Sequence, residues 1–425
     1  MRSNPDFPAL AAADAPAAPA SRFTLTASGR AFAQISRFHP ELTAFRRDLH
    51  AHPELGFEEV YTSGRVAEAL TLCGVDAVHR GIGKTGVVAV IRGRQSARAG
   101  AGVNPMVALR ADMDALTMTE HNSFGWRSSR PGVMHGCGHD GHTTMLVGAA
   151  RYLAATRNFA GDAVLVFQPA EEGRGGATAM INDGLFERFP VLAIYAMHNW
   201  PAMQPGTIGL NAGPMMAAAD RITITVTGKG GHGAHAYLTV DPVLAAAHII
   251  TALQSIVARN VAPLDQGVVT IGMIHAGTAG NVIPDTVELT GTIRAFKDEV
   301  MALLRDRITA VVNGVAAAMG VSANLRFSEI VIPPTVNDPA MAAVVRETAT
   351  ELVGAQNMDH TERTMGAEDA SYFLRAVPGA YVFVGAGNKA AGIAEPHHSP
   401  RFQIDEDALP LSVAIVTASA IKMLG

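Results

Sequence analysis

Cysteine, charged residues and long apolar runs are all scarce in this sequence. Only Cys73 and Cys137 occur in 425 residues, which excludes a disulfide framework and is typical of a reducing compartment, so a cytoplasmic protein is expected. The charged share of 17% and net charge of −5 provide no basic field for nucleic acid. No uninterrupted apolar stretch reaches the roughly 18 residues that span a bilayer. Neither nucleic acid nor membrane is therefore expected as a partner, and a small molecule is.

The start of the chain and its length predict how it is divided. The first residues are rich in Ala, Pro and Ser but lack a basic start followed by a continuous apolar segment, so a signal peptide is not expected. We predict a flexible tail over residues 1–35. Because 425 residues exceed the size at which one hydrophobic core stops growing, two compact units are expected.

Strand and helix patterns alternate in the first half of the chain. This alternation predicts an α/β unit with a mixed, largely parallel sheet wrapped by helices, whose chemistry gathers at the strand ends. The expected strands are at 87–91, 106–110, 163–167 and 192–197, and the expected helices at 62–74 and 142–155.

The pattern changes near residue 217. Strands and helices then follow in a βαββαβ order, which predicts a small two-layer unit inserted into the larger one. These elements are expected at 221–227, 241–258, 268–274, 286–295, 299–319 and 323–331. After the insert we expect a helix at 338–353, a buried strand at 381–384 and a helix from 405 to the end. Residues 36–216 and 334–425 are thus assigned to one domain, and residues 217–333 to the insert.

The segment His135-Gly-Cys-Gly-His-Asp-Gly-His142 packs three histidines, a thiol and an aspartate into eight positions. Glycine permits the tight turns that let Cys137 and His139 converge on one ion, and thiolate and imidazole are ligands that Zn²⁺ or a similar cation prefers. The alternative is a Gly-rich turn with surface histidines.

Two adjacent carboxylates, Glu171 and Glu172, follow an apolar strand and Gln168-Pro169. Neighbouring residues in a turn point in different directions, so one carboxylate can bind metal while the other moves a proton between water and a leaving nitrogen. We assign Glu171 as general acid/base and Glu172 as ligand. A solvated acidic turn is the alternative.

Three further positions are weaker candidates when each is taken alone. His198 ends another apolar strand and could be a ligand, although a lone histidine there is more often a satisfied polar group. His397 and His398 lie in a proline-bounded turn. Asp114 follows a buried strand and could accept the second ring N–H of a ligating histidine, or lie in a solvated turn.

The insert offers polar groups for a substrate. His232 follows Gly228-Lys-Gly-Gly, which lacks the ending of a phosphate-binding loop, and could instead stabilise the oxyanion of a tetrahedral intermediate. Arg294 could form a bidentate pair with a substrate carboxylate, or be a surface residue. Asn281 is a polar amide in a turn.

Together these motifs resemble the M20 metallopeptidase family, and specifically its amidohydrolase branch, which hydrolyses N-acyl amino acids, hippurate and auxin conjugates. The similarity runs from about Arg46 to the end of the chain. The motifs that carry it are Arg46–Glu58, Arg110–Asp114, Met134–His142, Gln168–Gly173, Gly228–His232, Asn281–Pro284, Gly366–Asp369 and His398–Pro400.

The resemblance implies a metallohydrolase catalytic domain with two divalent ions per subunit (Zn, Mn, Co or Ni) and an inserted lid domain that forms a homodimer, with a homotetramer as the alternative. It implies that Glu171 activates the water, that His232 polarises the substrate carbonyl, in many members across the dimer, and that Asn281 and Arg294 hold the substrate carboxylate. The implied ligands are Cys137, His139, Glu172, His198 and His398.

Three positions depart from the family pattern. Ala236-Tyr237 replaces a frequent Pro-His pair after the lid histidine, and Gly366-Ala367 replaces a more usual Gly-Ser. Asp112 stands where peptidase branches place a metal-binding histidine, a substitution typical of the amidohydrolase branch. None of the three removes an implied ligand.

These features favour hydrolysis of the amide bond of N-acyl-L-amino acids to a carboxylic acid and a free amino acid. A metallo-carboxypeptidase or dipeptidase is the alternative that keeps the same site. A catalytically silent binder and a thiol protease centred on Cys137 are the alternatives from other classes, and the latter lacks a placed orienting residue.

Overall fold

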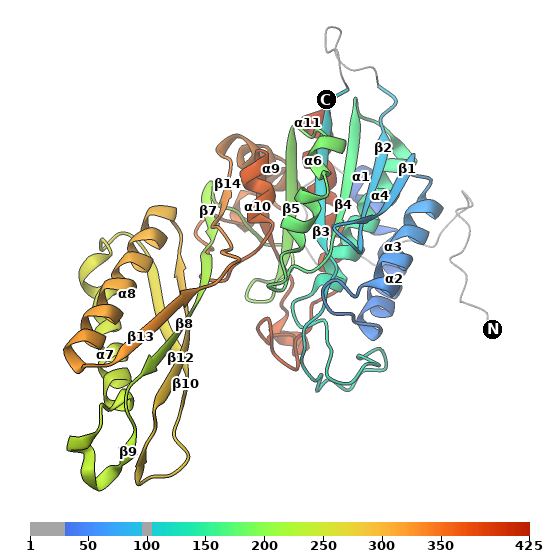
Figure 1. The fold of residues 1–425 in the computed structure, drawn as a ribbon. Coiled ribbons are helices and arrows are strands. Elements are labelled where there is room, and N and C mark those ends of the chain that lie inside the picture. Colours follow the sequence, from blue (N-terminus) through green and yellow to red (C-terminus); the bar gives the residue numbers. More distant parts are fainter. Residues whose placement is uncertain (1–29, 96–103) are drawn as a thin grey trace.

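The chain folds into two units, a larger one with helices on both faces of a sheet and a smaller one with helices on one face (Figure 1). This computed structural model describes residues 30–95 and 104–425. The mixed α/β class predicted from the sequence is confirmed.

In the described part of the chain, eight strands form the larger sheet, in the order β1-β2-β4-β3-β5-β16-β6-β15. They are β1 (Ala77–Ile82), β2 (Gly86–Arg92), β3 (Met106–Asp112), β4 (Asp162–Gln168), β5 (Ala193–Trp200), β6 (Ile208–Gly209), β15 (Met358–Asp359) and β16 (Gly379–Gly385). The central strands β4, β3, β5 and β16 are parallel, whereas β1, β2 and β6 each run antiparallel to a neighbour. Since parallel strands end at one edge, the residues that follow them meet there.

An apolar core lies on each face of this sheet, so its strands are buried on both faces. In β2, for example, Val87 and Ala89 belong to one core, and Val88 and Val90 to the other. The helices on the first core are α1 (Arg30–Ser36), α2 (His39–Ala51), α3 (Val60–Cys73), α4 (His139–Thr156), α9 (Pro339–Val353) and α11 (Ala408–Leu424). Those on the second are α5 (Gly176–Asn182), α6 (Leu185–Arg188) and α10 (Ser371–Ala376).

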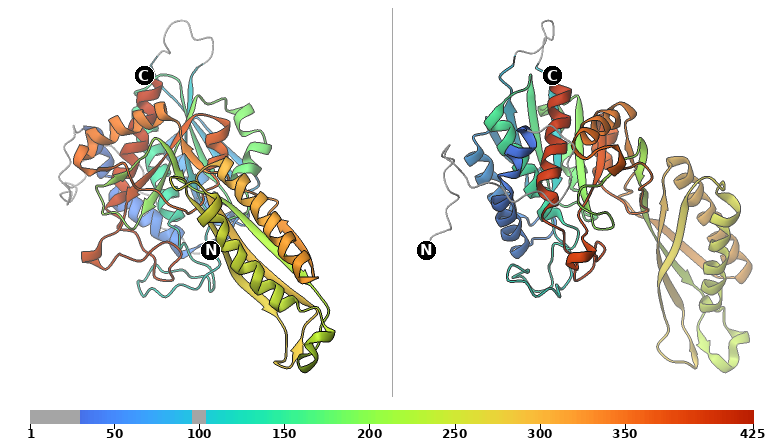
Figure 2. Two further views of the ribbon diagram at one scale, coloured as in Figure 1. Left: turned by 90° about the vertical axis from the view of Figure 1, so that its left-hand side faces the viewer. Right: turned by 180° about the vertical axis from the view of Figure 1, so that it is seen from behind.

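The smaller unit is an antiparallel sheet in the order β10-β12-β8-β13, with its own core beneath two helices on one face (Figure 2). Its elements are β8 (Ala218–Thr227), α7 (Pro242–Asn260), β10 (Gly267–Ala276), β12 (Thr286–Ala295), α8 (Asp298–Met319) and β13 (Ser322–Phe327). Alternate residues of β8 face the helices, which explains the alternating pattern in its sequence. A small ladder of β9 (Gly231–His232) with β11 (Val282–Ile283), followed by η1 (Gly233–Leu238), forms the tip far from the larger unit (Figure 1).

The two segments that connect the units lie side by side. On the way out β7 (Gly213–Met216) pairs antiparallel with β14 (Thr335–Asn337) on the way back. A further bridge joins Ala219 to Ile332. The limits of the insert expected from the sequence, 217 and 333, lie next to this double connection.

The structure corrects some expectations at element ends. The predicted tail extends too far, because α1 begins at Arg30 and its Ile35 packs into the core at 1% exposure, while residues 1–29 lie outside the described range. The strand expected at 323–331 ends at Phe327, where the Ser328 backbone N–H turns to donate to Asp220. The last helix begins at Ala408 rather than at 405, after a turn closed by Asp405.

Helix α7 is the one helix of the described residues that is long and apolar enough to cross a membrane by length and composition. Its Ile249, Leu253 and Ile256 are buried in the core of the smaller unit. Helices of that kind occur in the cores of proteins that span no membrane, so this feature does not overturn the expectation of a protein without a membrane partner.

Candidate active site

The loop before α4 places a thiol and an imidazole side by side. Gly138 has φ +90, and a Cβ there would lie 2.3 Å from the Asn199 amide nitrogen, so only glycine fits. The loop can therefore turn sharply between Cys137 and His139, as the glycine spacing predicts. His139, the first residue of α4, is buried, with Nδ1 3.3 Å from an Asp114 carboxylate oxygen.

The acidic turn after β4 is held by backbone hydrogen bonds to two buried carboxylates. Ala170 has φ +54, a left-handed conformation that costs energy in a residue with a Cβ, and its N–H donates to Glu59 at 2.8 Å. The next two N–H groups, of Glu171 and Glu172, donate to the two oxygens of Asp114, both at 3.0 Å. Three consecutive N–H groups thus fix the direction of both glutamate side chains.

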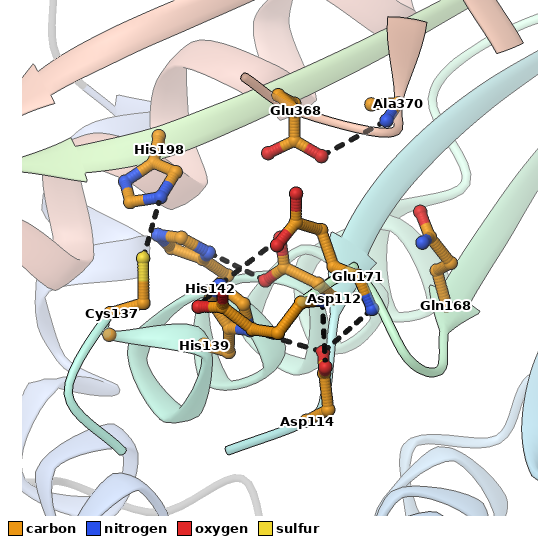
Figure 3. A network of polar contacts seen from close by, with 12 residues as sticks. Asp112, Asp114, Cys137, His139, His142, Gln168, Glu171, His198, Glu368 and Ala370 are labelled. Atoms are coloured by element: carbon orange, nitrogen blue, oxygen red, sulfur yellow. Dashed lines mark hydrogen bonds and ion pairs between the residues drawn. The ribbon is translucent and has the colours of Figure 1, made fainter. Parts of the chain in front are cut away.

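Two histidines complete the cluster from distant parts of the chain. His198, near the end of β5, has Nδ1 2.8 Å from the Asn199 carbonyl oxygen, while its Nε2 lies 3.4 Å from the sulfur of Cys137 (Figure 3). His398 has φ +63, and its N–H donates to the Gly136 carbonyl at 2.8 Å. The C-terminal segment is thereby tied to the loop that carries the thiol.

The five ligands predicted from the sequence lie in two groups that share Cys137. Within each group, one donor atom per residue lies within 4.8 Å of the others. The groups are Cys137, His139 and His198, and Cys137, Glu172 and His398. A third group joins His139 and Glu172 to Glu171.

The donor chemistry fits two transition-metal cations. Sulfur, imidazole and carboxylate are the ligands that zinc and related ions take. His139 Nε2 and Glu172 Oε1 are buried and have no hydrogen-bond partner among the described residues. Glu172 Oε1 lies 4.0 Å from His139 Nε2 and 3.3 Å from His398 Nε2. Buried polar atoms are normally satisfied, so ligand atoms that face one another without a hydrogen bond indicate room for a cation.

Another cluster, Asp112 with His139 and His142, fits a cation less well. His142 Nδ1 lies 2.6 Å from Asp112, and His142 Nε2 accepts the Asn199 backbone N–H at 3.0 Å, so both ring nitrogens are engaged. Burial alone would raise the pKa of Asp112, but His139, His142 and the Arg110 guanidinium hold it well below its usual range. Asp112 therefore orients histidines as a carboxylate.

Glu171 lies against two further carboxylates, Glu368 and Asp369, which were not predicted as site residues. Arg110 donates to Glu368 at 2.9 Å and lies 3.4 Å from Asp369, and the Tyr381 hydroxyl also donates to Glu368. Burial, followed by the charges of Glu368 and other acids, raises the pKa of Glu171 well above its usual range. Such a carboxyl is suited to accept and return a proton. In the sequence, the Gly366–Asp369 motif was the feature that could have pointed to Glu368.

A cavity of about 910 Å³ opens above the cluster, between the two units. Its floor includes Cys137, Glu172 and His398, and its opposite wall includes Thr292 and Arg294 of β12. Arg294, predicted to bind a substrate carboxylate, thus faces the same cavity as the predicted ligands.

His232 and Asn281 do not line this cavity. His232 belongs to β9, which lies at the tip of the smaller unit (Figure 1). The Gly233 N–H beside it donates to the Asn281 carbonyl at 2.8 Å. His232 and Asn281 are both exposed. Within one chain the structure separates them from the predicted ligands, so their predicted contact with substrate would need a second subunit.

The fold and the site together define a metal-dependent hydrolase. Residues 108–422 match the model of peptidase family M20/M25/M40, and the chain belongs to this family. The family resemblance drawn from the sequence is therefore confirmed.

Relatives of established name cover most of the chain. The IAA-amino acid hydrolase ILR1-like 4 of Arabidopsis thaliana is 39% identical over 396 residues, covering 92% of this chain and 88% of that protein. A hippurate hydrolase of Campylobacter jejuni is 41% identical over 352 residues, covering 83% and 89%. A thermostable carboxypeptidase of Saccharolobus solfataricus is 38% identical over 381 residues, covering 89% and 94%.

A solved structure shares the whole architecture. A dinuclear metal-binding peptidase of the M20 family from Bacillus subtilis superposes with a TM-score of 0.77 at 34% identity, covering 91% of this chain and 98% of that one.

The substitution Glu59→Gln should stabilise the protein above neutral pH. Burial raises the pKa of Glu59 to about 7, so this group contributes stability below the unfolded pKa that is lost as the pH rises through 7. Glutamine can still accept the Ala170 N–H. The variant's advantage in free energy of unfolding should grow by on the order of 2 kcal/mol between pH 5 and pH 8.

Urea unfolding at both pH values, followed by the fluorescence of Trp126 and Trp200 in the larger unit, measures this difference. Glu187→Gln, on the exposed surface of α6, is the control. An equal pH dependence in wild type and Glu59→Gln would contradict the assignment.

Asp114→Asn should lower the affinity for divalent cations about 10- to 100-fold, as is typical when a group that orients a ligand is lost. An amide nitrogen cannot accept the hydrogen bonds that one Asp114 oxygen receives. Competition with a chromophoric chelator on the stripped protein measures the affinity, with exposed Asp306→Asn as control. Unchanged affinity in Asp114→Asn would remove its orienting role.

Proposed function

We propose that this protein hydrolyses the amide bond of N-acyl-L-amino acids at a two-cation site, releasing a carboxylic acid and a free amino acid. The observation that carries the proposal is that two three-donor groups share Cys137 directly beside the buried Glu171. The relatives named as hydrolases of IAA-amino acids and hippurate support an acyl amino acid as substrate.

The proposed ligands are Cys137, His139, Glu172, His198 and His398. Cations held there would supply Lewis acidity toward the amide carbonyl and the attacking water. Asp114 orients His139 and both glutamates of the turn, and Asp112 engages His142 behind them.

Glu171 is the proposed general acid/base. It takes a proton from the water as the C–O bond forms, and it returns the proton to the nitrogen as the C–N bond breaks. Burial and the charges of Glu368 and Asp369 raise the pKa of Glu171, which makes it a stronger base toward the water.

Arg294 is proposed to hold the substrate carboxylate from the opposite wall of the cavity. His232 and Asn281 would serve the cavity of a second subunit, so a homodimer formed through the insert is part of the proposal. The identity of the cations, among Zn, Mn, Co and Ni, is left to metal analysis of the purified protein.

A metallo-carboxypeptidase or dipeptidase is the second candidate. It requires the same cluster and the same general acid/base, and the carboxypeptidase from Saccharolobus solfataricus is a relative of comparable identity. The two candidates differ in whether the group on the scissile carbonyl is an acyl group or an amino acid.

Glu171→Gln should leave the metal content unchanged and lower kcat by about 10²- to 10⁴-fold, because the variant cannot accept a proton. Metal analysis and turnover of N-acetyl amino acids measure the two quantities on one preparation. Glu187→Gln should behave as wild type. Turnover retained in Glu171→Gln would refute the assigned role, and turnover that survives chelation would point instead to a thiol enzyme.

A substrate panel separates the two candidates. We expect kcat/KM for N-acetyl and N-benzoyl amino acids to exceed that for dipeptides of the same C-terminal residue by about tenfold or more. Higher values for the dipeptides would favour the peptidase. No turnover of either class by the metal-loaded protein would contradict both.

A further inference from the structure

None of the described helices covers one face of the smaller unit's sheet, and this face carries two arginines near the connection to the larger unit. Helices α7 and α8 occupy the other face (Figure 2). In the ladder between β8 and β12, Arg221 is opposite Thr292 and Arg294 is opposite Ala219. The two arginines are therefore diagonal neighbours on the same face, and such pairs lie about 7 to 8 Å apart. Both line the 910 Å³ cavity.

Both guanidinium groups lack a counter-charge within the part of the chain that the structure describes. Neither forms an ion pair or a side-chain hydrogen bond there. Burial lowers the pKa of Arg294, and no acidic residue opposes this effect. By contrast Asp220, the residue before Arg221, lies on the buried, helix-covered face of β8 and pairs with Arg305 at 3.4 Å. For the half-buried Arg294, the lack of a partner is costly unless a ligand supplies the charge. Arg221 is exposed on the cavity wall, where its guanidinium is free to bind a ligand.

One carboxylate would satisfy one of these arginines, and the proposed function already assigns it to Arg294. Arg221 lies two residues further from the connection along β8 than the residue opposite Arg294. Two carboxylates of the smaller unit and its connection line the cavity among the described residues, Asp220 and Glu329. Asp220 pairs with Arg305, and Glu329 is exposed and forms no ion pair with either arginine. A substrate group with a second negative charge would fill this position.

We propose that Arg221 is a specificity-determining residue that binds a second carboxylate of the substrate, beyond the one held by Arg294. The inference rests on the proposed function and narrows it to N-acyl amino acids with two carboxylates. The second carboxylate can belong to the side chain of an acidic amino acid or to a dicarboxylic acyl group. In Asp and Glu only two or three carbon atoms separate the two carboxylates. Arginines that are diagonal neighbours can each bind one of them.

Two substrate pairs, each differing by one negative charge, test the inference. The first is N-acetyl-L-glutamate against N-acetyl-L-glutamine, for the side chain. The second is N-succinyl-L-alanine against N-butanoyl-L-alanine, for the acyl group. In at least one pair the wild type should prefer the doubly charged member in kcat/KM, and Arg221→Gln should reduce that preference on the order of 10- to 100-fold.

The matched control is Arg326→Gln. Arg326 is on the same uncovered face, opposite Thr223, but does not line the cavity, so its loss changes the net charge equally and should leave both preferences unchanged. Arg294→Gln should lower kcat/KM for all four compounds. A preference that is absent in both pairs, or that Arg326→Gln reduces as much as Arg221→Gln, would overturn the inference.

Binding distinguishes failure of this inference from failure of the proposed function. Calorimetry with metal-loaded Glu171→Gln should detect tighter binding of the doubly charged member of the responsive pair. The double variant Glu171→Gln with Arg221→Gln should lose that difference. If the difference is present while the wild type hydrolyses none of the compounds, the anion site stands and the proposed function fails. If hydrolysis occurs and the difference is absent, the anion site fails alone.

Discussion

The whole site depends on three consecutive backbone N–H groups after β4, which donate to two buried carboxylates. They hold Ala170 in a left-handed conformation and so point Glu171 and Glu172 toward the cluster. The contact is close, because a Cβ on Gly56 would lie 2.8 Å from the Ala170 Cα. Segments more than a hundred residues apart must therefore be packed before the acid pair takes its direction, which couples catalytic geometry to the folding of the larger unit.

The parallel part of the sheet explains how distant residues meet. Asp112 ends β3, the glutamate pair follows β4, His198 lies near the end of β5, and the segment after β16 leads to His398. All these strands end at the same edge. Like Ala170, His398 has a left-handed backbone conformation, and its N–H donates to the Gly136 carbonyl. This hydrogen bond joins the C-terminal segment to the loop that carries Cys137.

Much of the fold and the cluster could be predicted from the sequence, because periodicity and dense motifs are local signals. The glycines around Cys137 and the apolar strand before Glu171 lie within a few residues of the side chains whose positions they predict. Glu59 could not be found in this way, since it lies in an ordinary acidic segment and gains its role only through Ala170, far along the chain. The place of Glu368 in the site became apparent only from its contact with Arg110. The distance between His232 and the cavity could not be predicted either, because it depends on the length of the insert.

The paired segments β7 and β14 have a consequence for how such enzymes diversify. Because the insert leaves and rejoins the larger unit through neighbouring strands, its ends are close, a geometry in which whole domains can be inserted or exchanged. The proposed cation ligands lie entirely on one side of that junction, and the arginine-bearing wall lies on the other. Evolution, or protein engineering, can thus replace the insert that contacts the substrate without changing the residues proposed to carry out the reaction.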